Sequence, residues 1–147
     1  MAVAQTLFAL TAPAAASSGI TAWRGVVMDG STRGNVKLPA STPEITFYGV
    51  SDQNGVDVNG EGTYVLYGVA IIESDGSAVV NPGDSIVLVG TTGQGKSQAI
   101  AIPSAPGTQG NWTVRQIIGM CVNRAQLPAT ANVRIEVLLR VNIVPCA

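Results

Sequence analysis

The segment Gly90–Ser97, GTTGQGKS, matches the pattern G-x-x-x-x-G-K-[ST] of phosphate-binding P-loops residue for residue. In that chemistry the loop leads into a helix whose first backbone N–H groups bind the phosphates. The short apolar run Asp84–Val89 precedes the segment, as a strand precedes a true P-loop. The residues that follow decide whether such a site can form.

The residues after Ser97 predict a strand and not a helix. Gln98–Ile102 alternates in the manner of a strand, and Pro103 and Pro106 follow it. Proline is poorly tolerated inside a helix, so no helix of useful length fits there. The chain also offers neither the alternation of strands and helices nor the magnesium-binding aspartate of this class. We therefore predict that Gly90–Ser97 is a hairpin loop without nucleotide affinity.

Other catalytic chemistry has few candidate residues in this sequence. The sequence contains no histidine, which excludes the Ser-His-Asp triad and most zinc sites. Lys37 and Lys96 are the candidate bases for a serine–lysine site. Five carboxylates lie in separate turns without the spacing of a calcium loop: Asp52, Asp57, Glu61, Asp75 and Asp84. We expect no enzyme activity, no cofactor and no metal.

The two cysteines leave two alternatives open. Cys121 and Cys146 are too few to build a metal knuckle, but they could form one disulfide. Cys121 lies in an apolar run, where a buried free thiol is the commoner state. The free thiol is therefore the favoured alternative.

The N-terminal residues 1–18 resemble a secretory signal only in part. Ala14–Ala16 would suit a cleavage site after the apolar residues Leu7–Leu10, but no Lys or Arg precedes them. No apolar run approaches the roughly 20 residues of a membrane-spanning helix. A secretory signal is therefore an open but not the favoured alternative, and we expect no membrane segment.

The composition indicates a single domain with an unusually neutral surface. The chain has 147 residues, of which 12% are charged, against about 25% in typical domains. Charge depletion is characteristic of the cores of protein interfaces, so part of the surface is expected to be covered by copies of the chain or by a partner. The net charge is -1 and no two of the eight cations are adjacent, which argues against nucleic-acid binding.

Alternating apolar residues and dense turn signals predict a mainly β chain. The clearest strand has one apolar face, which consists of Val133, Ile135, Val137, Leu139, Val141 and Ile143. Short helices are expected only within Gly119–Ala131 and near the N-terminus. The predicted strands are Ile20–Met28, Asn35–Leu38, Ile45–Val50, Thr63–Ile72, Ala78–Val80, Ser85–Val89, Gln98–Ile102, Trp112–Val122 and Val133–Val144.

A glycine recurs between apolar residues within three of these strands, at Gly49, Gly68 and Gly119. Glycine weakens the interior of a strand, so its use there indicates a sharp bend or a close backbone approach. Coincidence is the alternative, because the chain has 17 glycines.

From residue 20 to about residue 144 the chain resembles the head decoration proteins of tailed bacteriophages, the lambda head protein D type. The motifs behind this resemblance are generic strand and turn patterns, and the segment Thr32–Pro43 is extra length relative to a minimal member. The matching segments are Ile20–Met28 before Asp29-Gly30, Gly49-Val50, Gly68-Val69-Ala70, the run DGSAVVNPGDSIVLVG, and the closing NVRIEVLLRV.

The resemblance implies a mainly β, tulip-like small barrel or sandwich with short helices, formed by residues 19–147. Residues 20–44 are a candidate N-terminal β subdomain. It also implies a homotrimer on the outer surface of the virion, bound to the major capsid protein at threefold positions, with no nucleic acid or membrane as a partner.

The resemblance further implies that residues 1–18 are a flexible arm that becomes ordered on the capsid. Its apolar anchors are Val3, Leu7, Phe8 and Leu10. We also expect aromatic residues at the trimer or capsid interface, namely Trp23, Tyr48, Tyr67 and Trp112.

Two other classes of protein remain as alternatives. A secreted β-sandwich module for carbohydrate binding or adhesion would have a cleaved N-terminus and a disulfide between Cys121 and Cys146. A nucleotide-binding enzyme would need a helix after Lys96.

Overall fold

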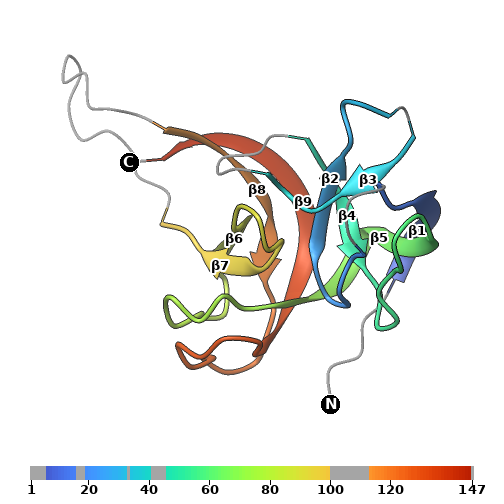
Figure 1. Ribbon diagram of the computed structural model, residues 1–147. Helices are drawn as coiled ribbons and strands as arrows, with labels where there is room; N and C mark the ends of the chain where they lie inside the picture. The colour runs from blue at the N-terminus through green and yellow to red at the C-terminus, as the bar shows by residue number, and fades with distance from the viewer. Residues whose placement is uncertain (1–5, 16–18, 33, 41–45, 100–112, 147) are drawn as a thin grey trace.

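The structure is a computed structural model that describes residues 6–15, 19–32, 34–40, 46–99 and 113–146. Within these ranges nine strands form one sheet in the order β3-β2-β4-β5-β9-β8-β6-β7, with β1 pairing β5 off this path (Figure 1). The strands are β1 (Thr6–Pro13), β2 (Gly25–Met28), β3 (Val36–Lys37), β4 (Phe47–Ser51), β5 (Glu61–Glu73), β6 (Ser85–Leu88), β7 (Gly95–Ser97), β8 (Thr113–Cys121) and β9 (Arg134–Cys146).

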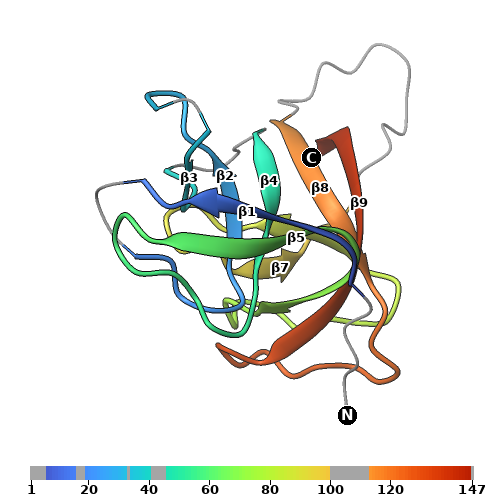
Figure 2. The same cartoon turned by 90° about the vertical axis from the view of Figure 1, so that its right-hand side faces the viewer.

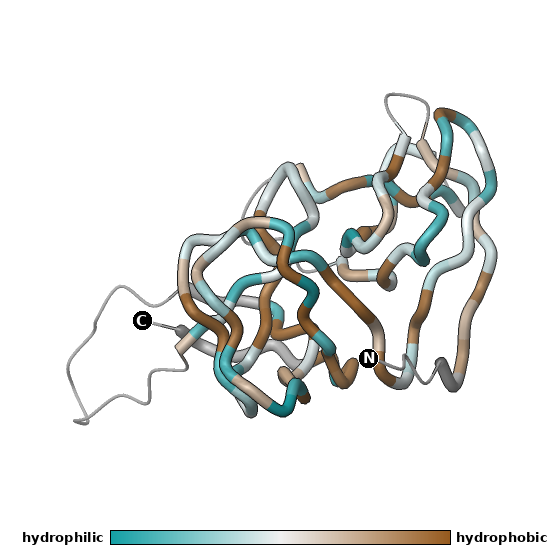
Figure 3. Tube along the Cα trace, turned by 90° about the horizontal axis from the view of Figure 1, so that it is seen from below, coloured by the Kyte–Doolittle hydropathy of each residue, from teal (hydrophilic) through white to brown (hydrophobic). Residues whose placement is uncertain are grey.

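The sheet curls into two halves that share β5. Every strand pair is antiparallel, and two isolated parallel bridges, Ala14 to Val36 and Ser74 to Gly95, bring the outer strands back toward β1 and β5. One half therefore contains β1 to β4 and the first part of β5, and the other contains the rest of β5 and β6 to β9. Figures 1 and 3 show these halves side by side, and Figure 2 shows β1 and β5 of the N-terminal half in front. The prediction of a mainly β fold is confirmed, and the tulip-like arrangement stays a prediction.

The long strand β5 changes partners at its middle. Its first part pairs with β1 and β4, whereas Val69–Glu73 pairs with β9. Gly68, between the two parts, has a φ of 105°, which side chains other than glycine rarely adopt. Glycine at this position therefore allows one strand to serve both halves of the sheet.

The sheet carries two apolar clusters, and the larger one includes residues of both halves. Burying one aliphatic side chain contributes about 1.5–3 kcal/mol. The smaller cluster lies in the N-terminal half and consists of Ala12, Ala14, Ile20, Val26, Val36 and Tyr64. The larger cluster consists of Val50, Val65, Ala70, Ile72, Val80, Ile86, Ile118, Cys121, Ile135, Val137 and Leu139.

The alternation predicted for the last strand is confirmed from Ile135 to Leu139 and is wrong at Val141, which is 46% exposed. Ile135, Val137 and Leu139 are buried in the larger cluster, whereas Arg134 and Arg140 are exposed. The period of two therefore marked the face of the strand that packs on the core.

The recurring glycines mark places where the backbone of one strand approaches the next. A Cβ atom at Gly49 would lie 2.8 Å from the carbonyl oxygen of Val65, and one at Gly119 would collide with the carbonyl oxygen of Leu138. The pairing of β8 with β9 shifts register just before Gly119. With the bend at Gly68, this confirms the interpretation as bends and close approaches.

The expectation of short helices is wrong for the residues that the structure describes. The first part of Gly119–Ala131 completes β8 and the rest forms turns and irregular backbone, while Thr6–Pro13 is the strand β1. The cause is tertiary: β1 makes cross-strand pairs with β5 along its length, and such pairing overrides the helix propensity of residues such as alanine and leucine, which is only a small free-energy preference. Residues 16–18 lie outside the described ranges.

The predicted arm and subdomain can be located only in part. Residues 6–15 of the arm are described and contain β1, and residues 1–5 are not. Residues 20–44 contribute β2 and β3, which belong to the same sheet as the other strands. Mobility of the arm in the free protein stays a prediction.

Candidate functional site

The segment that matches the P-loop pattern is a hairpin. Strands β6 and β7 pair antiparallel, with Ile86 opposite Ser97 and Leu88 opposite Gly95, so the Gly-Lys-Ser sequence lies in a strand. No helix begins there, and the helix N-terminus that binds phosphates in this motif is missing from the described segment. The predicted hairpin is confirmed, although β7 is Gly95–Ser97 and not the predicted Gln98–Ile102. Residues 100–102 of that prediction lie outside the described ranges.

Of the five carboxylates that were predicted to lie in turns, Asp75 and Asp84 accept hydrogen bonds there, whereas Glu61 is the first residue of the strand β5. Asp84 accepts a hydrogen bond from the Ser97 hydroxyl (2.8 Å) and another from the Asn81 amide (2.8 Å), and Asp75 accepts from the amide of Ser77 (3.0 Å). Within the described residues no group of three or more metal-ligating side chains is close enough to hold an ion. Asp75 and Asp84 therefore stabilise turns.

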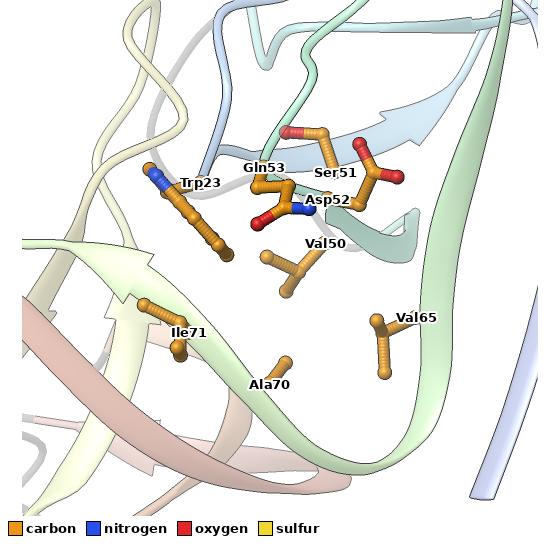
Figure 4. A pocket seen from close by; sticks show the side chains of 8 residues that line it. All are labelled: Trp23, Val50, Ser51, Asp52, Gln53, Val65, Ala70 and Ile71. Atoms are coloured by element: carbon orange, nitrogen blue, oxygen red, sulfur yellow. The ribbon is translucent and has the colours of Figure 1, made fainter. Parts of the chain in front are cut away.

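A hollow of about 200 Å³ lies beside Trp23, where the two halves of the sheet meet at β5 (Figure 4). Apolar side chains of β4 and β5 form much of its lining, and three consecutive residues at and after the end of β4 add polar groups. The lining consists of Trp23, Val50, Ser51, Asp52, Gln53, Val65, Ala70 and Ile71. Figure 4 shows the indole nearly edge-on, with Gln53 and Val50 beside it.

Trp23 has a strained backbone conformation that its neighbours hold in place. Its φ is 61°, an unusual value for a bulky residue that costs about 1–3 kcal/mol. Its amide donates to the carbonyl of Asp52 (3.4 Å), and its own carbonyl accepts from the amide of Glu73 (3.0 Å). The guanidinium of Arg134 lies over the indole, 5.0 Å from the ring centroid. Two hydrogen bonds therefore hold the main chain of Trp23, and the guanidinium of Arg134 covers its indole.

The three polar residues of the hollow differ in their free hydrogen-bonding capacity. The hydroxyl of Ser51 accepts from the amide of Arg24 (3.0 Å) and donates to the carbonyl of Thr21 (3.0 Å), so it is engaged. The carboxylate of Asp52 accepts from the amide of Asn54 (2.9 Å) and still has acceptor sites. The side chain of Gln53 is exposed and has no hydrogen-bond partner among the described residues.

An ion pair stabilises the backbone next to the hollow. Arg24 Nη2 lies 2.9 Å from Glu73 Oε2, and the two side chains are 13% and 18% exposed. Arg24 Nη1 is buried without a hydrogen-bond partner in the described part of the chain. Trp23 precedes Arg24, and its carbonyl accepts a hydrogen bond from the amide of Glu73. The ion pair and this backbone hydrogen bond therefore join the same two segments, the one that carries Trp23 and the end of β5.

A second candidate surface is apolar and lies where β1 pairs with β5. Phe8 and Tyr67 are register partners and are 52% and 58% exposed, and Leu10 nearby on β1 is 42% exposed. Neighbouring exposed apolar residues of this kind often mark a contact with another protein. We call Phe8, Leu10 and Tyr67 the β1–β5 surface.

The structure separates the residues that were expected at interfaces. Phe8 and Tyr67 are register partners and Leu10 is two residues from Phe8 on β1, but Trp23 lines the hollow. Tyr48 is partly buried against the smaller core, and its ring meets that of Tyr64 edge-on at 5.9 Å. Val3 and Trp112 lie outside the described residues, and Leu7 is described only as part of the β1 backbone.

Sequence reasoning missed the polar side of the hollow. Ser51, Asp52 and Gln53 follow the Gly-Val pair of β4; Asp52 was interpreted only as a turn carboxylate, and the other two were assigned no role. Their position beside Trp23 depends on contacts between segments far apart in the chain. No local pattern could have revealed it.

The cysteines do not form the disulfide that was one of the two alternatives. Cys121 is a free, buried thiol at one end of β8, opposite Val137, whereas Cys146 pairs with Thr113 at the other end. Burial raises the pKa of the Cys121 thiol. The sulfur donates a hydrogen bond to Asn123 Oδ1 (3.3 Å).

The described residues include no helix with the length and hydropathy needed to cross a bilayer.

Comparison with known proteins gives one informative likeness of fold. No family model matches the chain, and no curated protein matches it significantly. Among solved structures, it is similar to the crystal structure of the head fiber gp8.5 N base in bacteriophage phi29, with a TM-score of 0.52 and 16% sequence identity. The match covers 90% of this chain and 95% of that chain. At this identity the likeness shows a shared fold.

Proposed function

We propose that this chain is a structural protein of a bacteriophage virion that attaches to the capsid. The observation that carries the proposal is the likeness of fold, along 90% of the chain, to the base of a phage head fiber. The resemblance of the sequence to head decoration proteins points to the same class. Neither comparison suggests catalysis, and we propose no enzymatic role, cofactor or nucleic-acid partner.

We further propose that the protein acts as a homotrimer on the outside of the capsid, with the major capsid protein as its partner. The charged fraction of 12% leaves a neutral surface suited to contact with other protein. A trimer that bridges several capsid subunits stabilises the closed shell, because it binds that state only. Threefold linkage also raises the effective concentration of the second and third contacts after the first has formed.

The β1–β5 surface is our candidate for the capsid contact. About half of the side chains of Phe8 and Tyr67 remains exposed, and full burial of such a residue contributes about 1.5–3 kcal/mol. Docking would therefore gain roughly 0.8–1.5 kcal/mol from each of the two side chains. One copy binds weakly on this basis, and three linked copies bind durably.

The first experiment measures the size of the particle. Light scattering coupled to gel filtration should give about 45 kDa, three times the 15.0 kDa of one chain. A mass of one chain at micromolar concentration would contradict the proposed trimer.

The second experiment measures binding to empty capsids of the same phage. The double variant Phe8→Ser with Tyr67→Ser should lose about tenfold to a hundredfold in affinity per subunit, because roughly 1.5–3 kcal/mol of burial is removed. Val79→Ser is the matched control, since Val79 is an exposed apolar residue of the other half. Point substitutions are preferable to deleting the arm because β1 pairs with β5. Capsid binding by the double variant at the wild-type affinity would exclude this surface.

A further inference from the structure

We propose that the hollow beside Trp23 binds one pyranose ring of a polysaccharide. Pyranoses have an apolar C–H face that packs on an indole and a rim of hydroxyl groups that form hydrogen bonds. The hollow supplies both kinds of partner, with Trp23 as one wall and the side chains of Asp52 and Gln53 among its lining. This site is separate from the proposed capsid contact and does not depend on it.

The conformation of Trp23 is the first support. Its φ of 61° would suit glycine or asparagine without comparable strain, so the backbone alone does not call for tryptophan. Strain of this kind collects at functional sites, where the surroundings hold the residue in place. Here the hydrogen bonds to Asp52 and Glu73 and the guanidinium of Arg134 provide that restraint. The indole is thus positioned before any ligand arrives.

The residues that line the hollow and its volume are the second argument for a sugar-binding site. Arg134 lies over the indole but is not among the residues that line the hollow. Besides Trp23, the apolar part of the lining comes from Val50, Val65, Ala70 and Ile71. A volume of about 200 Å³ is below the 300–1,000 Å³ of sites for drug-sized ligands, and it suits a single ring.

The polar groups define the chemistry of the ligand. The amide of Gln53 offers two N–H donors and an oxygen acceptor, and the carboxylate of Asp52 offers acceptor sites beyond those that Asn54 uses. A ligand with adjacent hydroxyl groups can donate to Asp52 and exchange hydrogen bonds with Gln53. The half-open site leaves the remaining hydroxyls in water, so we expect a dissociation constant on the order of 1–10 mM for a monosaccharide.

The sequence makes a direct measurement simple, because it has two tryptophans. Full-length protein labelled with 5-fluorotryptophan gives one ¹⁹F signal for Trp23 and one for Trp112, which serves as the internal reference. Titration with the methyl glycosides of glucose, galactose and N-acetylglucosamine should move the Trp23 signal saturably with at least one sugar and leave the Trp112 signal in place. Gln53→Ala should weaken that binding at least about fivefold.

Saturation-transfer NMR observed on the sugar tests variants without the indole. Trp23→Asn should abolish transfer while keeping the fold, because asparagine tolerates the left-handed conformation. Two controls should retain transfer: Tyr67→Ala removes an exposed aromatic side chain outside the hollow, and Thr91→Gly relieves backbone strain at a φ of 71° in the hairpin.

Three results would overturn the proposal. One is a Trp23 signal that none of the three glycosides moves at concentrations up to about 50 mM, above the expected dissociation constants. Another is a sugar-induced shift that Gln53→Ala leaves unchanged. The third is a shift of the Trp23 signal with ethylguanidinium chloride and with none of the sugars. That result would indicate that the hollow binds a cationic side chain of a partner protein.

Discussion

Replacing Glu73 by glutamine should destabilise the protein strongly, because it removes the only charged partner of a largely buried guanidinium within the described residues. Arg24 and Glu73 are 13% and 18% exposed and their charged atoms lie 2.9 Å apart. Arg24 Nη1 is already buried without a partner in that part of the chain. Glu73→Gln keeps the shape of the side chain but leaves the positive charge uncompensated.

The magnitude follows from the burial of the pair. Breaking a fully buried ion pair by removing one partner costs about 3–5 kcal/mol, and the remaining exposure of these side chains lowers our expectation to about 2–3 kcal/mol. For a chain of this length each kcal/mol corresponds to about 2–4 °C in melting temperature. We therefore expect a fall of roughly 4–12 °C.

Urea unfolding of a double-mutant cycle is the assay. Replacing both partners, as Arg24→Met with Glu73→Leu, should recover much of the loss, because an apolar pair needs no charge compensation. Glu61→Gln is the matched control, since Glu61 is an exposed glutamate at the other end of β5. If Glu73→Gln lowered the free energy of unfolding by less than about 0.5 kcal/mol, like an ordinary surface substitution, the pair would be solvated and the reasoning refuted.

Three further predictions concern stability and the hairpin. Gly119→Ala should cost about 1–3 kcal/mol in chemical denaturation because its Cβ would collide with the carbonyl oxygen of Leu138; Gly30→Ala, with open space around it, is the control, and equal stability of the two variants would contradict the clash. Burial raises the pKa of Tyr64 to about 12, from about 10 in an unfolded chain, so the stability that this shift contributes is complete below pH 10 and is lost as the pH rises through 12. Tyr64→Phe should flatten that part of the pH profile and be neutral or stabilising at pH 7, because the hydroxyl is buried without a partner in the described residues; an unchanged slope between pH 10 and 12 would count against it. Titration calorimetry with Mg-ATP should give no binding heat for the protein or for Lys96→Ala, whereas micromolar affinity lost in the variant would restore the P-loop interpretation.

Local patterns in the sequence were sufficient to predict much of the sheet. The burial of Ile135, Val137 and Leu139 follows from a period of two, which any strand with one buried face imposes. The hairpin at Gly90–Ser97 follows from the glycines and from the absence of helical sequence after them. Both features depend on neighbouring residues, so they can be inferred without knowing the tertiary contacts.

Features that depend on distant contacts could not be predicted in this way. The strand β1 has no strict alternation and ends in proline, and its structure comes from pairing with the distant strand β5, as in Thr11 opposite Thr63. The hollow requires Trp23 to lie beside Asp52 and beside residues on both sides of the bend at Gly68. The turn that places Trp23 is itself strained, so residue propensities argue against it.

Strand β5 contributes residues both to the β1–β5 surface and to the hollow, so its position bears on whether the capsid and a sugar can be bound at the same time. Tyr67 belongs to the β1–β5 surface, while Val65 and Ala70, on either side of it in the sequence, line the hollow. The two sites therefore share a strand, but the side chains that would recognise a ring, Trp23 and Gln53, come from other segments. A partner that covers Tyr67 can leave those two side chains accessible. Capsid-bound protein should accordingly still bind a pyranose if both proposals hold, and loss of sugar binding on the capsid would mean that the two contacts exclude each other.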